Sequence, residues 1–235
     1  SAVTDAILLE GGQNQLWFFE EYVRVAYERG TAQEYTNLSQ QSQAYSRLRE
    51  SLPTLVQSEP YRNRLGLLRA REFEEMRGLS NQVKADMSRV LTDGLARGLG
   101  PTDVARNLTE QTGIEQSRAN RIARTETSTA LRRARMDEAD QAREDLNLRT
   151  MEMHVSALST TTRVTHARRH GKLFTTDQQR EWWSEGANSI ACKCTTLSVM
   201  VDEKGEPLVP GFVERARANF KKQAEREDMP WVKDL

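Results

Sequence analysis

The chain has 235 residues and no net formal charge, and its hydrophobic fraction of 37% is low beside a charged fraction of 29%. This composition suits elongated helices with narrow apolar stripes. It argues against a membrane partner, since no apolar run approaches the roughly 20 residues that cross a bilayer. Two cysteines are too few for a disulfide scaffold and favour synthesis in a reducing cytosol.

The first hundred residues carry three stripes of apolar side chains at helical spacing. The stripes are Leu16, Phe19, Val23 and Ala26; Tyr35, Leu38, Tyr45 and Leu48; and Leu79, Val83, Met87, Val90 and Leu95. Stripes of this kind are most often core or partner-helix contacts. Because seams this narrow are poorly buried in an isolated monomer, we interpret residues 1–100 as a helical region that binds a protein partner.

Residues 101–146 predict a short helix, a turn at Gly113 and a long helix that ends at about Leu146. Two helices joined by a glycine-containing turn also form the helix-turn-helix of many DNA-binding proteins. An ordinary helical hairpin is the commoner structure for such a pattern.

A helical wheel of the long helix places five arginines within one third of its circumference: Arg118, Arg121, Arg124, Arg132 and Arg135. Residues 117–180 carry 13 Arg or Lys against 8 Asp or Glu. The arginine face is therefore a candidate for non-specific contacts with the phosphates of double-stranded DNA.

Another face of the same helix is lined by alanines, which permit close packing, and Glu126 projects among them. A carboxylate on a packing face must be protonated or paired, since an isolated buried charge is very costly. We expect Glu126 to be buried and paired with an arginine, for which Arg163 is the candidate. An active-site acid is the alternative.

Beyond Leu148 the pattern changes from helices to strands. Residues 149–155 alternate as in a half-buried strand, residues 194–201 form a second strand, and residues 211–228 could form a helix. The predicted fold class is α+β, mainly α: an elongated helical N-terminal half followed by a small α+β module with a short antiparallel sheet. The expected domains are residues 1–100, 101–201 and a C-terminal tail, 202–235.

Histidine and cysteine side chains gather in the second half of the chain. His166 and His170 are four residues apart, and Cys192 and Cys194 share a strand face unless the chain bends. Together they make a His2Cys2 set suited to one Zn²⁺ ion. The alternatives are ordinary packing or a cysteine nucleophile with a histidine base. A metal-dependent nuclease would need nearby carboxylates, and Asp177 is the only one close in sequence.

The order of RANRIARTETSTALRRARMDEA, VSALSTTTRVTHARRHGKLF and ACKC resembles the phage Mu protein F-like family of head morphogenesis proteins. The motif positions that match are Ile122 to Thr127 (with Arg124, Thr125 and Glu126), Arg163, His166, His170, Gly171, Phe174, Cys192 and Cys194. Two departures remove possible ligands. Many relatives carry a cysteine at Arg163, and a His-Pro pair where this chain has Ser189 and Ile190.

The resemblance implies a minor capsid protein without a settled enzymatic activity. Such proteins are virion components associated with the portal and the head interior, made in the host cytoplasm and acting in head assembly and DNA packaging or ejection. The expected partners are the portal protein, the major capsid protein and non-specific DNA. The alternatives are a phage-carried enzyme or toxin-like effector of the metal-dependent nuclease type, or a helix-turn-helix DNA-binding protein.

Overall fold

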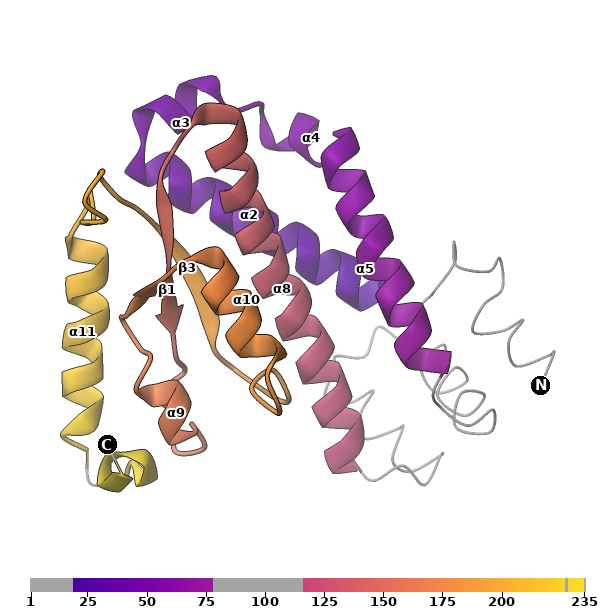
Figure 1. Ribbon diagram of the computed structural model, residues 1–235. Coiled ribbons are helices and arrows are strands. Elements are labelled where there is room, and N and C mark those ends of the chain that lie inside the picture. Colours follow the sequence, from indigo (N-terminus) through magenta and orange to yellow (C-terminus); the bar gives the residue numbers. More distant parts are fainter. Residues whose placement is uncertain (1–18, 78–115, 227, 235) are drawn as a thin grey trace. The chain divides into compact units, whose positions relative to one another are not determined.

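The computed structural model describes residues 19–77, 116–226 and 228–234 (Figure 1). The apolar stripe from Leu79 to Leu95, the residue Leu16 and the predicted turn at Gly113 lie outside these residues, so the helix-turn-helix hypothesis lies outside them too. The π-helix is η2 (Phe19–Val23) and the 3-10 helix is η3 (Pro230–Asp234). The α-helices are α2 (Arg24–Gln41), α3 (Gln43–Leu48), α4 (Leu52–Leu55), α5 (Glu59–Arg77), α8 (Gln116–Leu146), α9 (Val164–Ala167), α10 (Thr176–Ser184) and α11 (Gly211–Ala224).

A small antiparallel sheet follows the helical N-terminal half, which confirms the predicted fold class. Its strands are β1 (Thr150–Val155), β2 (Leu173–Phe174) and β3 (Thr195–Met200), in the order β2-β1-β3. The two long strands lie within the predicted ranges 149–155 and 194–201. The long helix ends at Leu146 as predicted, and α11 begins at the predicted residue but is shorter than expected.

The chain divides into two compact units that are not continuous in sequence. The first comprises Ser1–Ala26 and Pro53–Ala130, and the second comprises Tyr27–Leu52 and Leu131–Leu235. Residues 27–52, which we expected in a partner-binding region, therefore belong to the same unit as the sheet. Helix α8 supplies residues to both units.

The described part of the first unit has a small buried set of apolar residues and an ion pair beside it. Phe19 and Val23 of η2 are fully buried, as the first apolar stripe predicts. The Arg69 guanidinium of α5 lies 5.0 Å from the centre of the Phe19 ring and donates to Glu20 Oε1 at 2.7 Å. Leu67 of α5 is exposed.

The second unit buries the second apolar stripe inside itself. Leu38 of α2 and Tyr45 of α3 are fully buried and pack with Ala142 of α8 and Met200 of β3. Leu48, the last member of the predicted stripe, is instead 67% exposed because α3 ends there. This stripe therefore forms core rather than a seam for a partner.

Helix α2 approaches α8 closely at Gly30. A Cβ atom at this position would lie 2.5 Å from the carbonyl oxygen of Leu131 and 2.8 Å from the Cβ of Ala134. Ala134 is fully buried, as its place on the alanine face predicts. A glycine facing an alanine thus sets the distance between the two helices.

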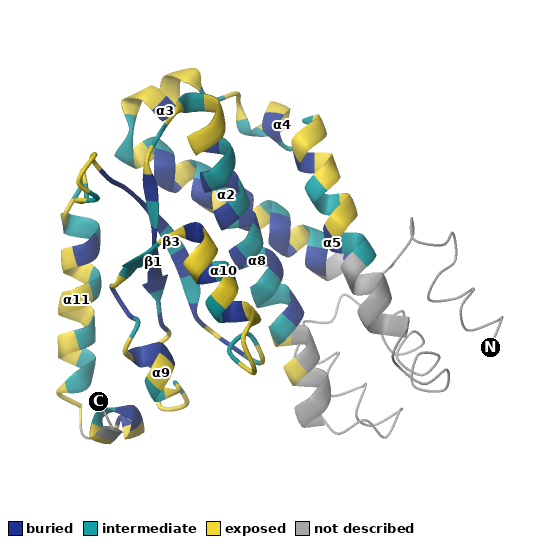
Figure 2. Ribbon diagram, viewed as in Figure 1, coloured by how far each residue is buried: buried dark blue, intermediate teal, exposed yellow. Residues whose placement is uncertain are grey.

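The two faces of the sheet differ in chemistry. Helix α11 covers one face, where Val213 packs with Met153 and Val199 (Figure 1). Helices α2, α8 and α10 cover the other face. Buried residues therefore predominate along β1 and β3, while α11 turns many exposed residues outward (Figure 2).

Replacing Gly30 by Ala is expected to destabilise the second unit by about 1–3 kcal/mol, since the added methyl group overpacks the contact between α2 and α8. The matched control is Gly66→Ala in α5, where an added Cβ would have nothing within 4 Å. That change should raise stability by up to about 1 kcal/mol through helix propensity. Thermal denaturation of both variants measures the difference, and equal responses would contradict the close contact.

Candidate functional site: a buried thiol–imidazole cluster

Polar side chains line the face of the sheet that α11 does not cover. Glu152 and His154 of β1 are paired in register with Ser198 and Thr196 of β3, and all four are fully buried. We call this set the inner polar face. The sequence predicted a half-buried strand over 149–155, but helices cover both faces of β1, so the strand is buried on both sides.

A buried carboxyl group organises one end of the inner polar face. Glu152 accepts hydrogen bonds from the hydroxyl groups of Ser198, at 2.6 Å, and Thr196. From α2, the amide of Asn37 donates to the Ser198 carbonyl at 2.8 Å and to Glu34 Oε1 at 2.7 Å. Helix α2 thus brings a second carboxyl group to the same face.

The carboxyl groups of Glu34 and Glu152 are both fully buried. Burial, with the neighbouring Glu152 charge as the next cause, raises the pKa of Glu34 from 4.5 to about 8. Burial also raises the pKa of Glu152, although the hydroxyl groups of Ser198 and Thr196 oppose this. Since burial disfavours the charged form and the nearby Glu152 carboxylate adds repulsion, the raised pKa favours a protonated Glu34 at neutral pH.

The other end of the inner polar face holds two imidazole rings and two thiols. We call His154, His166, Cys192 and Cys194 the thiol–imidazole cluster. They come from β1, from α9, and from the loop that leads into β3. Ala191, with φ of 50°, bends the chain just before the first cysteine, and both cysteines thereby reach the same imidazole.

The four side chains of the cluster lie close together. Each cysteine Sγ is 3.5 Å from Nδ1 of His166. The ligand atoms of His154, His166 and Cys194 all lie within 4.8 Å of one another. The hydrogen bond from Cys194 is the largest cause that lowers the pKa of the Cys192 thiol to about 3, and burial opposes it. The same hydrogen bond, together with burial, raises the pKa of Cys194.

Tryptophan rings from α10 cover the cluster. Trp183 stacks on His154 with ring centres 5.2 Å apart, and Trp182 meets His154 and His166 edge-on at 5.0 and 4.7 Å. Met136 of α8 packs with Trp183 and the two cysteines. The cluster is therefore enclosed, which suits a bound ion better than an exchanging substrate.

His170, which the sequence predicts as a metal ligand, lies outside the cluster. Its Nδ1 is 3.0 Å from the backbone nitrogen of Ser156, and its Nε2 is 3.1 Å from the carbonyl oxygen of Ala216. Helix α9 ends at Ala167, so the spacing of four residues does not bring His166 and His170 to one point. His154 takes the place that the prediction gave to His170.

Arg163 holds the loop that precedes the cysteines. Its guanidinium donates to three carbonyl oxygens, those of Ala187 at 2.5 Å, Asn188 at 3.0 Å and Ile190 at 3.3 Å. Glu126 is buried as predicted, with 9% of its surface exposed. Arg163 thus has partners other than the predicted Glu126, because its position at the start of α9 faces the loop.

Gly171 completes the turn between α9 and β2. Its φ is 70°, and its backbone nitrogen donates to the His154 carbonyl at 2.9 Å. An added Cβ would lie 3.2 Å from the Arg217 side chain of α11. The positive φ therefore favours glycine here, and the space beside Arg217 is tight.

Two of the five arginines predicted to face DNA are used inside the protein. Arg132 is 2% exposed, lies 4.6 Å from the ring centre of Trp183 and donates to the Cys194 carbonyl at 3.2 Å. Arg135 donates to the Thr196 carbonyl at 2.7 Å. The predicted arginine face is wrong at Arg132, since α8 packs this side chain over the cluster.

The arginines nearer the start of α8 are not packed inside the protein in the way that Arg132 is. Arg121 and Arg124 are exposed, while the side chain of Arg118 lies outside the described part of the structure. The hydroxyl of Thr125 donates to the Arg121 carbonyl at 2.6 Å, a contact within the helix. Arg121 and Arg124 remain candidates for phosphate contact.

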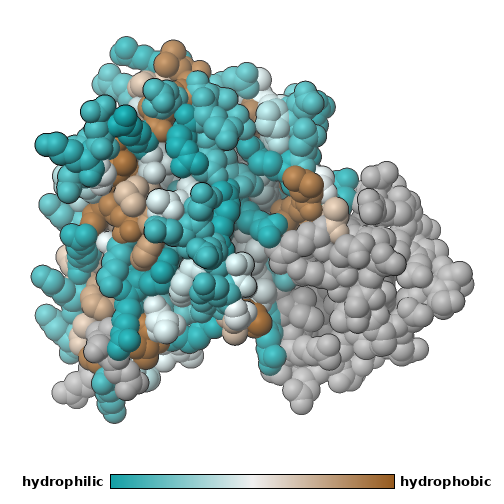
Figure 3. All heavy atoms as spheres, viewed as in Figure 1, coloured by the Kyte–Doolittle hydropathy of each residue, from teal (hydrophilic) through white to brown (hydrophobic). Residues whose placement is uncertain are grey.

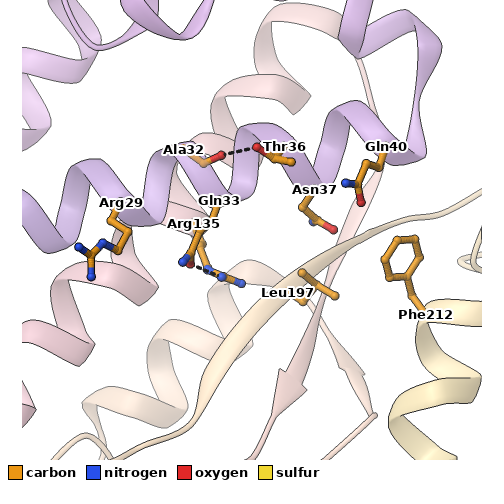
Figure 4. A pocket seen from close by; sticks show the side chains of 9 residues that line it. All are labelled: Arg29, Ala32, Gln33, Thr36, Asn37, Gln40, Arg135, Leu197 and Phe212. Atoms are coloured by element: carbon orange, nitrogen blue, oxygen red, sulfur yellow. Dashed lines mark hydrogen bonds between the residues drawn. The ribbon is translucent and has the colours of Figure 1, made fainter.

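A groove of about 510 Å³ lies outside the cluster, along α2 (Figure 4). Its lining residues are Arg29, Ala32, Gln33, Thr36, Asn37, Gln40, Arg135, Leu197 and Phe212. Arg135 donates to Gln33 and to the Thr196 carbonyl, so this guanidinium is already engaged. The groove thus differs in composition from the cluster, with which it shares none of its lining residues.

Residues 85–197 match the family model described as Phage Mu protein F like protein. This match supports the resemblance that the motifs indicate. The match to this family supports the interpretation of the chain as a phage head morphogenesis protein that is associated with the virion. Comparison with curated proteins and with solved structures found no match. Among the described helices, none is long and apolar enough to cross a membrane.

The raised pKa of Glu34 predicts how stability depends on pH. The folded state keeps a proton that the unfolded chain loses above its ordinary value of 4.5, so this contribution is complete below pH 4.5 and is lost as pH rises to about 8. Glu34→Gln mimics the protonated group. Its stability relative to wild type should therefore increase between pH 5 and pH 8, by at most about 1.4 kcal/mol per pH unit.

Urea denaturation at several pH values measures this difference. Glu144→Gln, which changes an exposed residue of α8, controls for the loss of one negative charge. A stability difference between Glu34→Gln and wild type that stays constant over the range would contradict the raised pKa.

Proposed function

We propose that the chain is a minor capsid protein that acts inside the phage head, next to the portal, during head assembly and DNA packaging or ejection. The observation that carries the proposal is the family match over residues 85–197. The partners in this proposal are the portal protein, the major capsid protein and packaged double-stranded DNA.

A structural role agrees better with the site than an enzymatic one. The four side chains of the thiol–imidazole cluster are buried beneath tryptophans. Asp177, the carboxylate nearest in sequence to His170, has a side chain that is 96% exposed and lies 3.9 Å from Arg180. Since a metal-dependent nuclease needs its carboxylates at the metal and an open coordination position, the cluster is not suited to that chemistry.

The partner-binding region is narrower than the predicted residues 1–100. Residues 27–52 form core in the second unit, where Leu38 and Tyr45 are buried, so they are not free to dock on a portal. The proposal therefore assigns portal contact to residues 1–26 and 53–100. On the face shown in Figure 3, hydrophilic side chains cover most of the described surface and hydrophobic ones form small separate groups.

Contact with DNA is assigned to the exposed arginines of α8. Replacing Arg121 and Arg124 by Ala should weaken non-specific DNA binding and reduce the slope of log K against log salt by about 2, since each lost phosphate contact removes about 0.9. The control is Arg47→Ala with Arg62→Ala, which removes the same charge at exposed positions of α3 and α5. Fluorescence anisotropy at several salt concentrations measures both. An equal loss in the control would show that net charge alone is responsible.

The assignment to the head interior is tested by removing the protein from its phage. A phage with a nonsense mutation in this gene is grown with or without the full-length chain supplied in trans. We expect defective heads without the chain, and restored particles in which asymmetric cryo-electron microscopy finds it at the portal vertex. Normal heads without the chain, or its location on the outer capsid surface, would overturn the proposal.

A further inference from the structure

We propose that the thiol–imidazole cluster is a structural zinc site, with His154, His166, Cys192 and Cys194 as its four ligands. This inference does not depend on the proposed function. It differs from the ligand set that the sequence suggests, because it includes His154 and excludes His170.

The spacing of the ligand atoms fits tetrahedral coordination. With Zn–S near 2.3 Å and Zn–N near 2.05 Å at the tetrahedral angle, a sulfur and a nitrogen ligand are about 3.5 Å apart. Both cysteine sulfurs lie 3.5 Å from Nδ1 of His166. His154 lies within 4.8 Å of the ligand atoms of His166 and Cys194, so a small movement of its ring completes the set.

The burial and hydrogen bonding of the His154 ring are a second, independent observation that supports a metal site. Its ring is fully buried, and neither of its nitrogens makes a hydrogen bond of standard geometry among the described residues, although the side chain of Gln179 lies near enough to interact with it. Leaving buried polar atoms without hydrogen-bond partners is energetically unfavourable. A bond from one nitrogen to a metal ion removes part of that cost, whereas packing alone does not.

The charges of the four ligands suit a divalent ion. Zinc binds imidazole in its neutral form and cysteine as the thiolate. Two cysteine thiolates would balance the charge of one Zn²⁺ ion, and two neutral imidazoles would add no charge.

The site is structural because the protein supplies all four ligands and covers them. A catalytic zinc keeps one position open to water or substrate. Here the ligands join β1, α9 and the loop before β3, whose apolar side chains pack in three separate clusters of the described residues. Zinc would hold these three segments together, as structural zinc does in other small modules.

The first experiment compares two histidine variants of the full-length chain. Wild-type protein purified under reducing conditions should contain close to one zinc per chain by elemental analysis. His154→Gln should weaken zinc binding by more than the roughly 10–100-fold that loss of a ligand's hydrogen-bond partner causes, as measured by competition with a chelating dye. His170→Gln is the matched control and should retain zinc. Zinc lost from His170→Gln but kept by His154→Gln would overturn the ligand set.

A second measurement keeps the proposal testable if a variant fails to fold. Wild-type protein loaded with Co²⁺ in place of zinc should show the intense visible absorption of tetrahedral cobalt and charge-transfer bands from thiolates. A chelator should abolish these bands, lower the melting temperature and expose two reactive thiols. Wild-type protein that binds neither metal, or that contains a disulfide between Cys192 and Cys194 after reducing purification, would overturn the zinc site.

Discussion

The burial of charged and polar groups on the inner polar face constrains the rest of the second unit. Glu152 is fully buried in a strand that is covered on both sides. A carboxyl group in such a place must be protonated or paired and must receive hydrogen bonds. Ser198 and Thr196 supply these bonds from the neighbouring strand. Every helix packed over this face therefore has to bring polar side chains with it.

This requirement explains why the second unit is not continuous in sequence. The residues that satisfy the backbone of β3 come from distant helices: Asn37 and Gln41 of α2 both donate to the Ser198 carbonyl at 2.8 Å, and Arg135 of α8 donates to the Thr196 carbonyl at 2.7 Å. Since these groups would otherwise stay unpaired, α2 is part of the module rather than a separate arm. The thiol–imidazole cluster continues the same face, and there the proposed zinc takes the place of hydrogen bonds.

Periodicity could predict the long helix α8 and the two long strands, but not β2, α9 or α10. The alternation in residues 149–155 and the β-branched run in 194–201 mark β1 and β3, and the alanine face correctly predicts the buried Ala134 and Glu126. Periodicity could not show that α2 covers the sheet. An apolar stripe such as Leu38 and Tyr45 has the same pattern whether it packs on its own chain or on a partner.

The candidate site was predicted only in part, for a related reason. The sequence indicated His166, Cys192 and Cys194, but spacing favoured His170 over His154, because two histidines four residues apart converge only if a helix continues through both. Helix α9 ends at Ala167, before His170, so His170 does not lie on the same helix as His166 and points elsewhere. Arg132 was misassigned to a DNA face because a wheel shows which residues share a side of a helix but not what covers that side.

X-ray absorption at the zinc edge, on purified full-length wild-type protein, tests most directly whether a metal completes the inner polar face. The structure predicts a first shell of two sulfur atoms near 2.3 Å and two nitrogen atoms at about 2.0–2.1 Å, with the multiple-scattering pattern of imidazole. A first shell of nitrogen and oxygen only, or protein without zinc that has the same melting temperature before and after zinc is added, would contradict it.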